Sequence, residues 1–80
     1  MKDFVVRMID EEKALAEKIE KLDAFLKLHK KDTELSLIKR NLMTIQFHQM
    51  IAYDLTLAQR IAIELEEEEK DDIEIIIEED

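Results

Sequence analysis

Residues 42–65, LMTIQFHQMIAYDLTLAQRIAIEL, decide the fold of this chain. Fifteen of these 24 residues are apolar, Tyr53 included, whereas a helix that packs on one neighbour needs about three apolar positions in seven. On a helix they form three lines: Leu42, Ile45 and Ala52; Met43, Phe47, Met50, Leu57 and Ile61; and Ile51, Leu55, Ala58, Ala62 and Leu65. One neighbouring helix cannot cover all three lines. We therefore expect a helix that packs between several partners.

The composition favours a helical chain that assembles with copies of itself. Eighty residues allow one small domain, and such a domain usually needs a disulfide, a metal or oligomerisation for its stability. The chain has no Cys, which excludes disulfides and thiolate-bound metals. It also has no Gly and no Pro, so Gly-rich phosphate loops are absent from the sequence. Oligomerisation remains as the stabilising device.

A second helix is predicted at residues 3–28. Its inner positions follow steps of three and four, and they are Val5, Met8, Glu12, Leu15, Ile19, Leu22 and Leu26. Residues 29–33 form the predicted turn, with Asp32 or Thr33 as the cap of a helix over about residues 34–68. So short a connection makes the helices antiparallel, and facing residues then have numbers that sum to about 62. Leu15 would face Phe47, Ile19 would face Met43, and Arg7 would face Asp54.

The charge is divided between two parts of the chain. The net charge is -9, but residues 1–63 carry 11 Lys and Arg against 10 Asp and Glu, whereas residues 64–80 carry Lys70 against 11 acids. We therefore predict a helical hairpin domain at residues 1–63 and an acidic helix end and tail at residues 64–80. The segment IEIIIE at residues 73–78 is rich in β-branched residues, which favours a short strand. It would pair with another copy, dock on the sheet edge of a partner, or remain disordered.

The location that the sequence predicts is the cytoplasm. Lys2 is followed by Asp3 and by no long apolar core, so a secretory signal is not expected. Asp54 and Arg60 interrupt the most apolar stretch, which argues against a membrane span.

Catalytic and metal-binding patterns are weak. His29 and His48 lie 19 residues apart and belong to no zinc-binding pair. Ser36 and Thr44 belong to no strained nucleophile turn and have no base in a recognisable motif. We expect a protein that is not an enzyme and holds no metal or cofactor.

A polar stripe on the second helix is the candidate binding site. Steps of three and four join Gln46, Gln49, Tyr53, Thr56 and Arg60 on one face, while Lys18 and Lys21 project beside the inner positions of the first helix. Amides, a phenol and cationic groups can hold a planar ligand that carries phosphate, because Arg forks onto phosphate oxygens and Tyr stacks on a base. The alternative is that these groups satisfy each other between helices of an oligomer, and the residues alone leave both open.

Two charged positions at the predicted interface receive structural interpretations. Arg7 would form an ion pair with Asp54. Glu12 is costly if it is buried without a partner, so it would contact Gln49, His48 or solvent, or it would set the helix register.

The acidic end offers a second interpretation. Closely spaced carboxylates imitate a phosphate backbone and can occupy a nucleic-acid site on a partner protein. Residues 66–80 would then dock on a host protein, by mimicry or by strand addition, and the chain itself would not bind nucleic acid directly. The plainer alternative is that these acids only keep the chain soluble.

Two stretches resemble a known family of hairpins encoded by phages. They are RMIDEEKALAEKIEKLDAFL at Arg7–Leu26 and MTIQFHQMIAYDLTLAQRIA at Met43–Ala62. Together they resemble the hairpin domain of anti-CBASS cyclic-nucleotide sponges, which is also found within some anti-Thoeris sponges. The similarity covers about three quarters of the chain and leaves the tail outside.

The resemblance implies a non-catalytic protein that sequesters cyclic di- or trinucleotides and thereby deprives a bacterial defence effector of its signal. Family members assemble as oligomers, often hexamers, with the ligand between protomers. By position, Thr44, Gln46 and Gln49 resemble the polar cluster of the family's second helix. Arg60 resembles its basic residue near the helix end, and Lys18 or Lys21 its first-helix lysine.

The sequence therefore predicts an all-α antiparallel hairpin that oligomerises through its second helix into a helical bundle. The leading hypothesis is a phage protein that sequesters a cyclic oligonucleotide in the cytoplasm of an infected bacterium. The alternatives are an acidic inhibitor or adaptor that docks on a host protein, and a structural oligomeric module of a phage.

Overall fold

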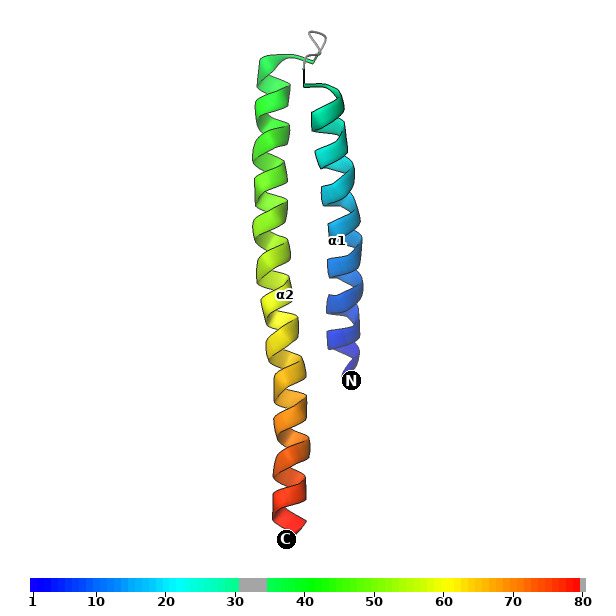
Figure 1. The fold of residues 1–80 in the computed structure, drawn as a ribbon, viewed down its shortest axis with the longest axis vertical. Coiled ribbons are helices and arrows are strands. Elements are labelled where there is room, and N and C mark those ends of the chain that lie inside the picture. The colour runs from blue at the N-terminus through cyan, green and yellow to red at the C-terminus, as the bar shows by residue number, and fades with distance from the viewer. Residues whose placement is uncertain (31–34, 80) are drawn as a thin grey trace.

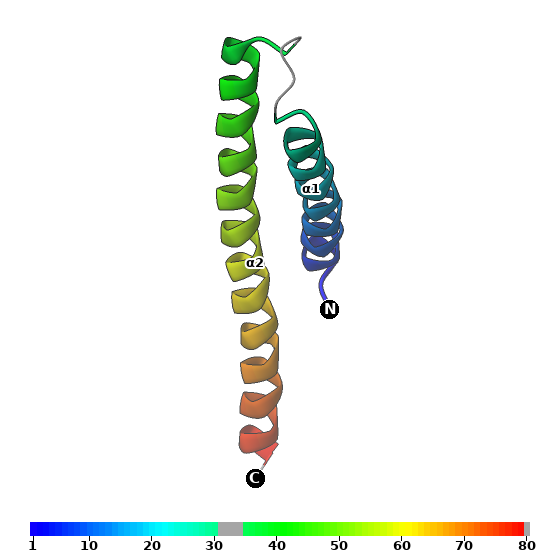
Figure 2. The ribbon, with the colours of Figure 1, turned by 45° about the horizontal axis from the view of Figure 1, so that its top comes forward.

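The computed structural model describes residues 1–30 and 35–79, with side chains for residues 1–30 and 35–69. Over these residues the chain forms two helices, α1 (Asp3–Leu28) and α2 (Leu37–Glu79). The helices lie side by side as an antiparallel hairpin, and the Cα atoms extend over 70 × 16 × 15 Å (Figures 1 and 2). The predicted all-α hairpin is confirmed.

Helix α1 has the predicted bounds. Asp3 in its first turn and Lys27 in its last turn suit the helix dipole, and Lys27 also forms an ion pair with Asp23 at 2.9 Å. The backbone N–H of His29 donates to the carbonyl of Phe25 at 3.0 Å and closes the last turn. All seven predicted inner positions of α1 are buried or half-buried, so the spacing of three and four identified the face that meets α2.

One of the three apolar lines of α2 packs on α1. It is the second line, and its members Met43, Phe47, Met50, Leu57 and Ile61 are buried or half-buried. The core is thin, because only Val5, Met8 and Leu57 among the described hydrophobic side chains are buried. Much of the other two lines stays open to solvent. No helix in the described part of the chain is long and apolar enough to cross a membrane.

Helix α2 begins later than predicted. Ser36 caps it, since its hydroxyl oxygen accepts the backbone N–H of Lys39 at 3.2 Å and its carbonyl accepts the N–H of Arg40 at 3.0 Å. The predicted caps, Asp32 and Thr33, lie outside the described residues. The helix therefore starts at Leu37 rather than near residue 34.

Helix α2 also ends later than predicted. Its backbone is helical to Glu79, so the predicted end near residue 68 and the predicted strand at residues 73–78 are both wrong. A strand needs a partner edge, whereas an existing helix gains one hydrogen bond for each added residue without a new nucleus. The side chain of Glu68 accepts the backbone N–H of Lys2 at 3.1 Å, at the start of α1. Beyond that contact α2 projects past the start of α1 (Figure 1). At the usual helical rise, residues 69–79 add roughly 16 Å to the rod.

The helices pair with a different stagger from the predicted one. Glu11 contacts Tyr53 and Glu12 contacts Asp54, so facing residues have numbers that sum to 64 or 66 rather than 62. The expected ion pair between Arg7 and Asp54 is absent from the described residues, where the carboxyl beside Asp54 belongs to Glu12. The predicted partners of Glu12, His48 and Gln49, are exposed instead. Two helices with a regular step of three and four can pair at several offsets along their axes. Packing of the apolar side chains selects one of these offsets.

Candidate functional site

Six of the seven predicted site residues are exposed. They are Lys18 and Lys21 on α1 and Gln46, Gln49, Tyr53 and Arg60 on α2, while Thr44 is half-buried. Thr56, which completes the predicted stripe, is also exposed. The stripe on α2 therefore forms a polar surface that remains exposed beside α1.

A hydrogen bond between the helices orders the middle of this surface. The hydroxyl of Tyr53 donates to the Oε1 atom of Glu11. This bond raises the pKa of Tyr53 above its ordinary value, with further contributions from burial and from the charge of Glu11, while the positive charge of Arg60 acts in the opposite direction. Arg60 is thus close enough to Tyr53 to act on it electrostatically. Glu11 was missing from the sequence prediction, because a carboxylate next to the inner position Glu12 resembled an ordinary solvated charge.

The contact between Glu11 and Tyr53 also sets which residues share one side of the hairpin. Lys18 follows Glu11 by seven residues, which is close to two helical turns, and Gln46 precedes Tyr53 by seven. Lys18 therefore lies level with Gln46 on the same side of the hairpin. We call this side, with Glu11 and Lys18 on α1 and Gln46, Tyr53 and Arg60 on α2, the polar flank. Lys21 lies one turn beyond Lys18, towards the loop.

The structure separates Thr44 from the polar flank. Thr44 and Gln46 are two positions apart, which on an α-helix corresponds to a rotation of about 200°. The Thr44 hydroxyl donates to the carbonyl of Arg40 at 2.9 Å, and that of Thr56 donates to the carbonyl of Ala52 at 3.1 Å. Both threonines thus bond to their own helix, four residues back. The polar flank keeps four side chains of different charge and shape, which are Lys18, Gln46, Tyr53 and Arg60.

A pair of carboxyl groups lies next to the polar flank, between the helices. Glu12 and Asp54 are both half-buried, and the Oδ1 atom of Asp54 is buried without a hydrogen-bond donor. Partial burial raises the pKa of Glu12 above its ordinary value, and the hydrogen bond and charge of Asp54 raise it further, while Lys13 acts in the opposite direction. Glu12 and Asp54 form a polar break in an otherwise apolar interface between the helices.

The described residues of one copy form a surface rather than a pocket. Within the described part of the chain no cavity was found, and no group of three His, Asp or Glu side chains there is arranged to hold a metal ion. His48 is exposed, with its ring 5.7 Å from that of Phe47, and the ring of His29 lies 4.3 Å from that of Phe25. A ligand on the polar flank would therefore remain largely exposed to water on an isolated chain.

A comparison with protein families identifies the relatives of this hairpin. The model of the Sequestin family matches residues 2–63, which is more than half of the chain. The chain belongs to the Sequestin family. The matched residues include the whole polar flank and all of the predicted site residues, and they stop before the acidic end of α2. A comparison with curated proteins and one with solved structures gave no match.

The stretches Arg7–Leu26 and Met43–Ala62 resemble sequestering hairpins, and membership of the Sequestin family confirms this resemblance. The family name denotes sequestration, which is binding without turnover. An exposed surface of amides, a phenol and cations suits the binding of a polar ligand.

Proposed function

We propose that this protein sequesters a cyclic di- or trinucleotide signal and so blocks anti-phage signalling in the cytoplasm of an infected bacterium. It binds the signal and does not transform it. The Sequestin match supports the sequestering role, and the chemistry of the polar flank supports the ligand class. Residues 1–63 would carry the binding function, and residues 64–80 would be a separate acidic end.

The observation that carries the proposal is the hydrogen bond between Tyr53 and Glu11. It holds the phenol ring at the centre of the polar flank, with Lys18 and Gln46 on one side along the hairpin and Arg60 on the other. Arg binds phosphate with two parallel hydrogen bonds and Lys binds it as a point charge. The amide of Gln46 both donates and accepts, as the edge of a nucleobase requires, and the ring of Tyr53 offers a stacking surface.

A closed binding site needs more than one copy of the chain. A single copy leaves the polar flank open, and it exposes large apolar side chains that include Leu42 at 61%, Ile45 at 52% and Leu55 at 59%. Apolar surface of this kind favours association. We propose that copies associate through α2 and that the ligand binds between them.

Titration calorimetry against a panel of cyclic di- and trinucleotides tests this function, with the matching linear dinucleotides as controls. We expect at least one cyclic nucleotide to bind with a defined stoichiometry and to be recovered unchanged. A panel without measurable heat from folded protein would overturn the proposal. Recovery of a cleaved nucleotide would overturn the claim that the protein is not an enzyme.

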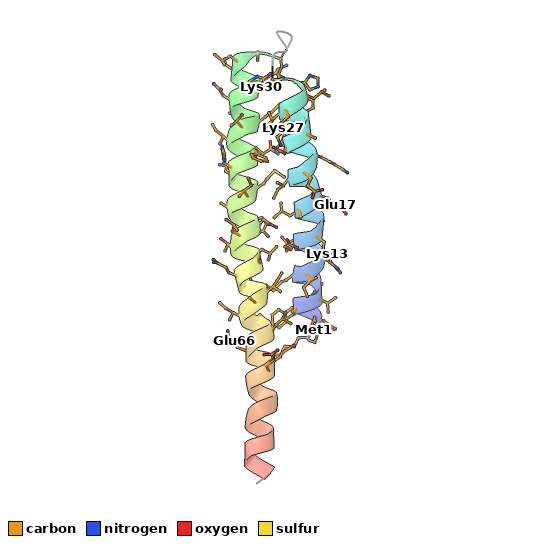
Figure 3. The ribbon with its side chains drawn as sticks, in the orientation of Figure 1. Met1, Lys13, Glu17, Lys27, Lys30 and Glu66 are labelled. Carbon is orange, nitrogen blue, oxygen red and sulfur yellow. The ribbon has the colours of Figure 1, made fainter. Side chains whose placement is uncertain are left out.

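Arg60→Ala should weaken binding of that nucleotide by about tenfold or more without changing the size of the assembly. Lys13→Ala is the matched control, because Lys13 is also an exposed cation but lies on the side of α1 away from α2 (Figure 3). Equal effects of the two substitutions would mean that the polar flank is not the site. Loss of the assembly in Arg60→Ala would assign Arg60 to an interface between copies.

The projecting end of α2 favours a second candidate function, in which the chain docks on a host protein. This end carries a net charge of -10 over residues 64–80, and the helix extends past the start of α1. Deletion of residues 66–80 separates the two candidates. Nucleotide binding should survive the deletion if sequestration is the function, whereas docking on a host protein should be lost.

A further inference from the structure

The three most exposed large apolar side chains of the described residues all lie at the loop end of the hairpin. They are Leu28 at 80%, Ile38 at 73% and Leu37 at 72%. Leu28 is the last residue of α1, and Leu37 and Ile38 are the first two residues of α2. The two helices therefore present aliphatic side chains to water at the same end of the rod (Figure 1).

Exposed lysines flank these side chains in the sequence, on both helices. Figure 3 shows two of them, Lys27 and Lys30, where α1 ends. Residues 27–40 as a whole carry five Lys and Arg against two Asp and Glu, a net charge of +3. We call the exposed lysines and aliphatic residues at this end the loop-end patch. Its members are Lys27, Leu28, Lys30, Leu37, Ile38 and Lys39.

We propose that the loop-end patch docks on the surface of a membrane that contains anionic phospholipids. Its lysines contact the lipid phosphates, and its aliphatic side chains enter the boundary between headgroups and acyl chains. Docking is peripheral, and only the ends of the two helices touch the bilayer. This activity goes beyond the proposed function and does not depend on it.

The size of the loop end favours a lipid surface over a folded protein. The rod has a cross-section of 16 × 15 Å between Cα atoms. A standard protein interface buries roughly 800 Å² on each partner, which is more than so narrow an end offers. A bilayer surface is deformable, and it takes up small groups of apolar side chains that have cations beside them.

The kinds of side chain favour a lipid over a nucleic acid. Proteins that bind single strands combine cations with aromatic rings on which the bases stack. The apolar members of the loop-end patch are all aliphatic. Cations alone account for contact with phosphates, whereas exposed aliphatic side chains gain free energy only where they leave water. An anionic bilayer therefore uses both kinds of side chain in the patch.

The acidic end of α2 is too far away to oppose this contact. From Ile38 to Glu64 the helix rises by roughly 39 Å, whereas exposed charges are screened over about 8 Å at physiological salt. The first acid of α2 is Asp54, and the last acid of α1, Asp23, is paired with Lys27. The loop end therefore acts locally as a positive charge, although the net charge of the chain is -9.

Docking through the loop end leaves the polar flank in water. Tyr53 follows Ile38 by 15 residues, which corresponds to roughly 22 Å along α2. Segments that bind at the lipid boundary sink by about 5–10 Å. A chain that stands on its loop end therefore keeps Tyr53 and Arg60 available to a ligand.

Sedimentation with vesicles tests the contact on the full chain. Each cation near an anionic surface strengthens binding by roughly fivefold, so wild-type protein should bind phosphatidylcholine vesicles that contain about 30% phosphatidylglycerol. It should bind vesicles of phosphatidylcholine alone at least about tenfold more weakly. Absence of binding to the anionic vesicles by folded protein, or equal binding to both kinds, would overturn the proposal.

Two matched pairs of substitutions locate the contact, with circular dichroism to confirm that each variant is folded. Ile38→Ser should weaken binding to the anionic vesicles by about tenfold, whereas Ile63→Ser, at an exposed isoleucine far along α2, should leave it unchanged. Lys39→Ala should weaken binding by roughly fivefold, whereas Lys13→Ala, at an exposed cation away from the loop end, should have little effect. Equal effects within either pair would overturn the assignment to the loop-end patch.

A fluorescent label shows which part of the rod touches the membrane. The chain has no Cys, so an environment-sensitive dye attaches only at the thiol introduced by Leu28→Cys or by Ile63→Cys. With anionic vesicles the emission of the dye at position 28 should shift to shorter wavelength, while that at position 63 should stay as it is in water. Equal shifts at both positions would mean that the rod lies flat on the membrane, and would overturn docking through the loop end.

Titration with duplex DNA separates a lipid surface from other polyanions. We expect the chain to bind DNA at least about tenfold more weakly than anionic vesicles, because the aliphatic side chains contribute only at the bilayer. Equal affinity for both, with no effect of Ile38→Ser on either, would overturn the membrane proposal. Vesicle binding without nucleotide binding would overturn only the proposed function, and nucleotide binding without vesicle binding would overturn only this inference.

Discussion

At the scale of single residues, two acidic side chains of α1 give the hairpin its polar character. Glu11 accepts the hydroxyl of Tyr53 at the surface, and its neighbour Glu12 meets Asp54 between the helices. Adjacent residues on a helix point about 100° apart. One carboxylate therefore orders the polar flank, while the next interrupts the apolar contact. Glu11 raises the pKa of Tyr53, and the pKa of Glu12 is itself raised by burial and by Asp54.

The pair of Glu12 and Asp54 makes the stability of the hairpin depend on pH. Because the pKa of Glu12 is raised in the folded protein, its contribution is most favourable below the ordinary value of 4.5 and is lost as the pH rises through the raised pKa. Glu12→Gln, which stays neutral, should raise the Tm at pH 7 by an amount of order a few degrees.

Thermal unfolding of the Glu12 variant at pH 7 and pH 4 checks this sign. The difference from wild type should shrink at pH 4, where the wild-type carboxyl takes up its proton. Glu17→Gln, on the exposed side of α1 away from α2, is the control and should have no comparable effect (Figure 3). A lower Tm of Glu12→Gln at pH 7 would contradict the prediction.

The chain has one Tyr and no Trp, so the titration of Tyr53 can be followed directly by ultraviolet absorbance. In wild-type protein the phenol should titrate above its ordinary value of 10.0, because the bond to Glu11 favours the neutral phenol. Glu11→Gln should move the midpoint of the titration down towards that value. Glu17→Gln should leave it unchanged, and an equal shift in both variants would argue against the bond.

At the scale of the helices, the start of α2 depends on one side chain. The first N–H groups of a helix have no partner within it, and the oxygen of Ser36 accepts one of them from Lys39. The chain has no Gly or Pro with which to mark the boundary. The cap formed by Ser36 is therefore the local feature that starts α2 at Leu37.

Ser36→Ala should destabilise the hairpin by about 1 kcal/mol, as the loss of an N-cap does in other helices. Denaturant unfolding measures the change as a lower midpoint with an unchanged slope. Ser36→Asp keeps an acceptor at this position and should retain most of the stability. If Ser36→Ala and Ser36→Asp lost the same amount, the cap would not explain the effect.

At the scale of the whole molecule, the hairpin is a long rod with a thin core, exposed apolar lines and opposite charges at its two ends. Only three described side chains, Val5, Met8 and Leu57, are buried. A small chain without disulfides gains stability when further copies cover such apolar surface. Folding and assembly are therefore expected to be coupled.

This coupling predicts that the midpoint of unfolding rises with protein concentration, because mass action favours the associated state. Circular dichroism over a hundredfold range of concentration measures the midpoint. A midpoint of wild-type protein that does not change with concentration would contradict the coupling of folding to assembly.

The sequence by itself determined the local features of this protein. The step of three and four between Val5 and Leu26 marked the inner face of α1, because a helix brings such residues to one side. The excess of apolar residues over residues 42–65 marked α2 as a helix with more apolar surface than α1 can cover. The chemistry of the polar stripe was also readable, since residue types and their spacing depend on one helix alone.

Only the tertiary structure decided how the helices meet. It showed that the line through Phe47 and Leu57 faces α1, that Glu12 rather than Arg7 meets Asp54, and that Glu11 orders Tyr53. These features depend on stagger, which the whole interface sets and no local pattern encodes. The structure also decided the length of α2. Residues 73–78 have the composition of a strand, but they extend the helix that precedes them.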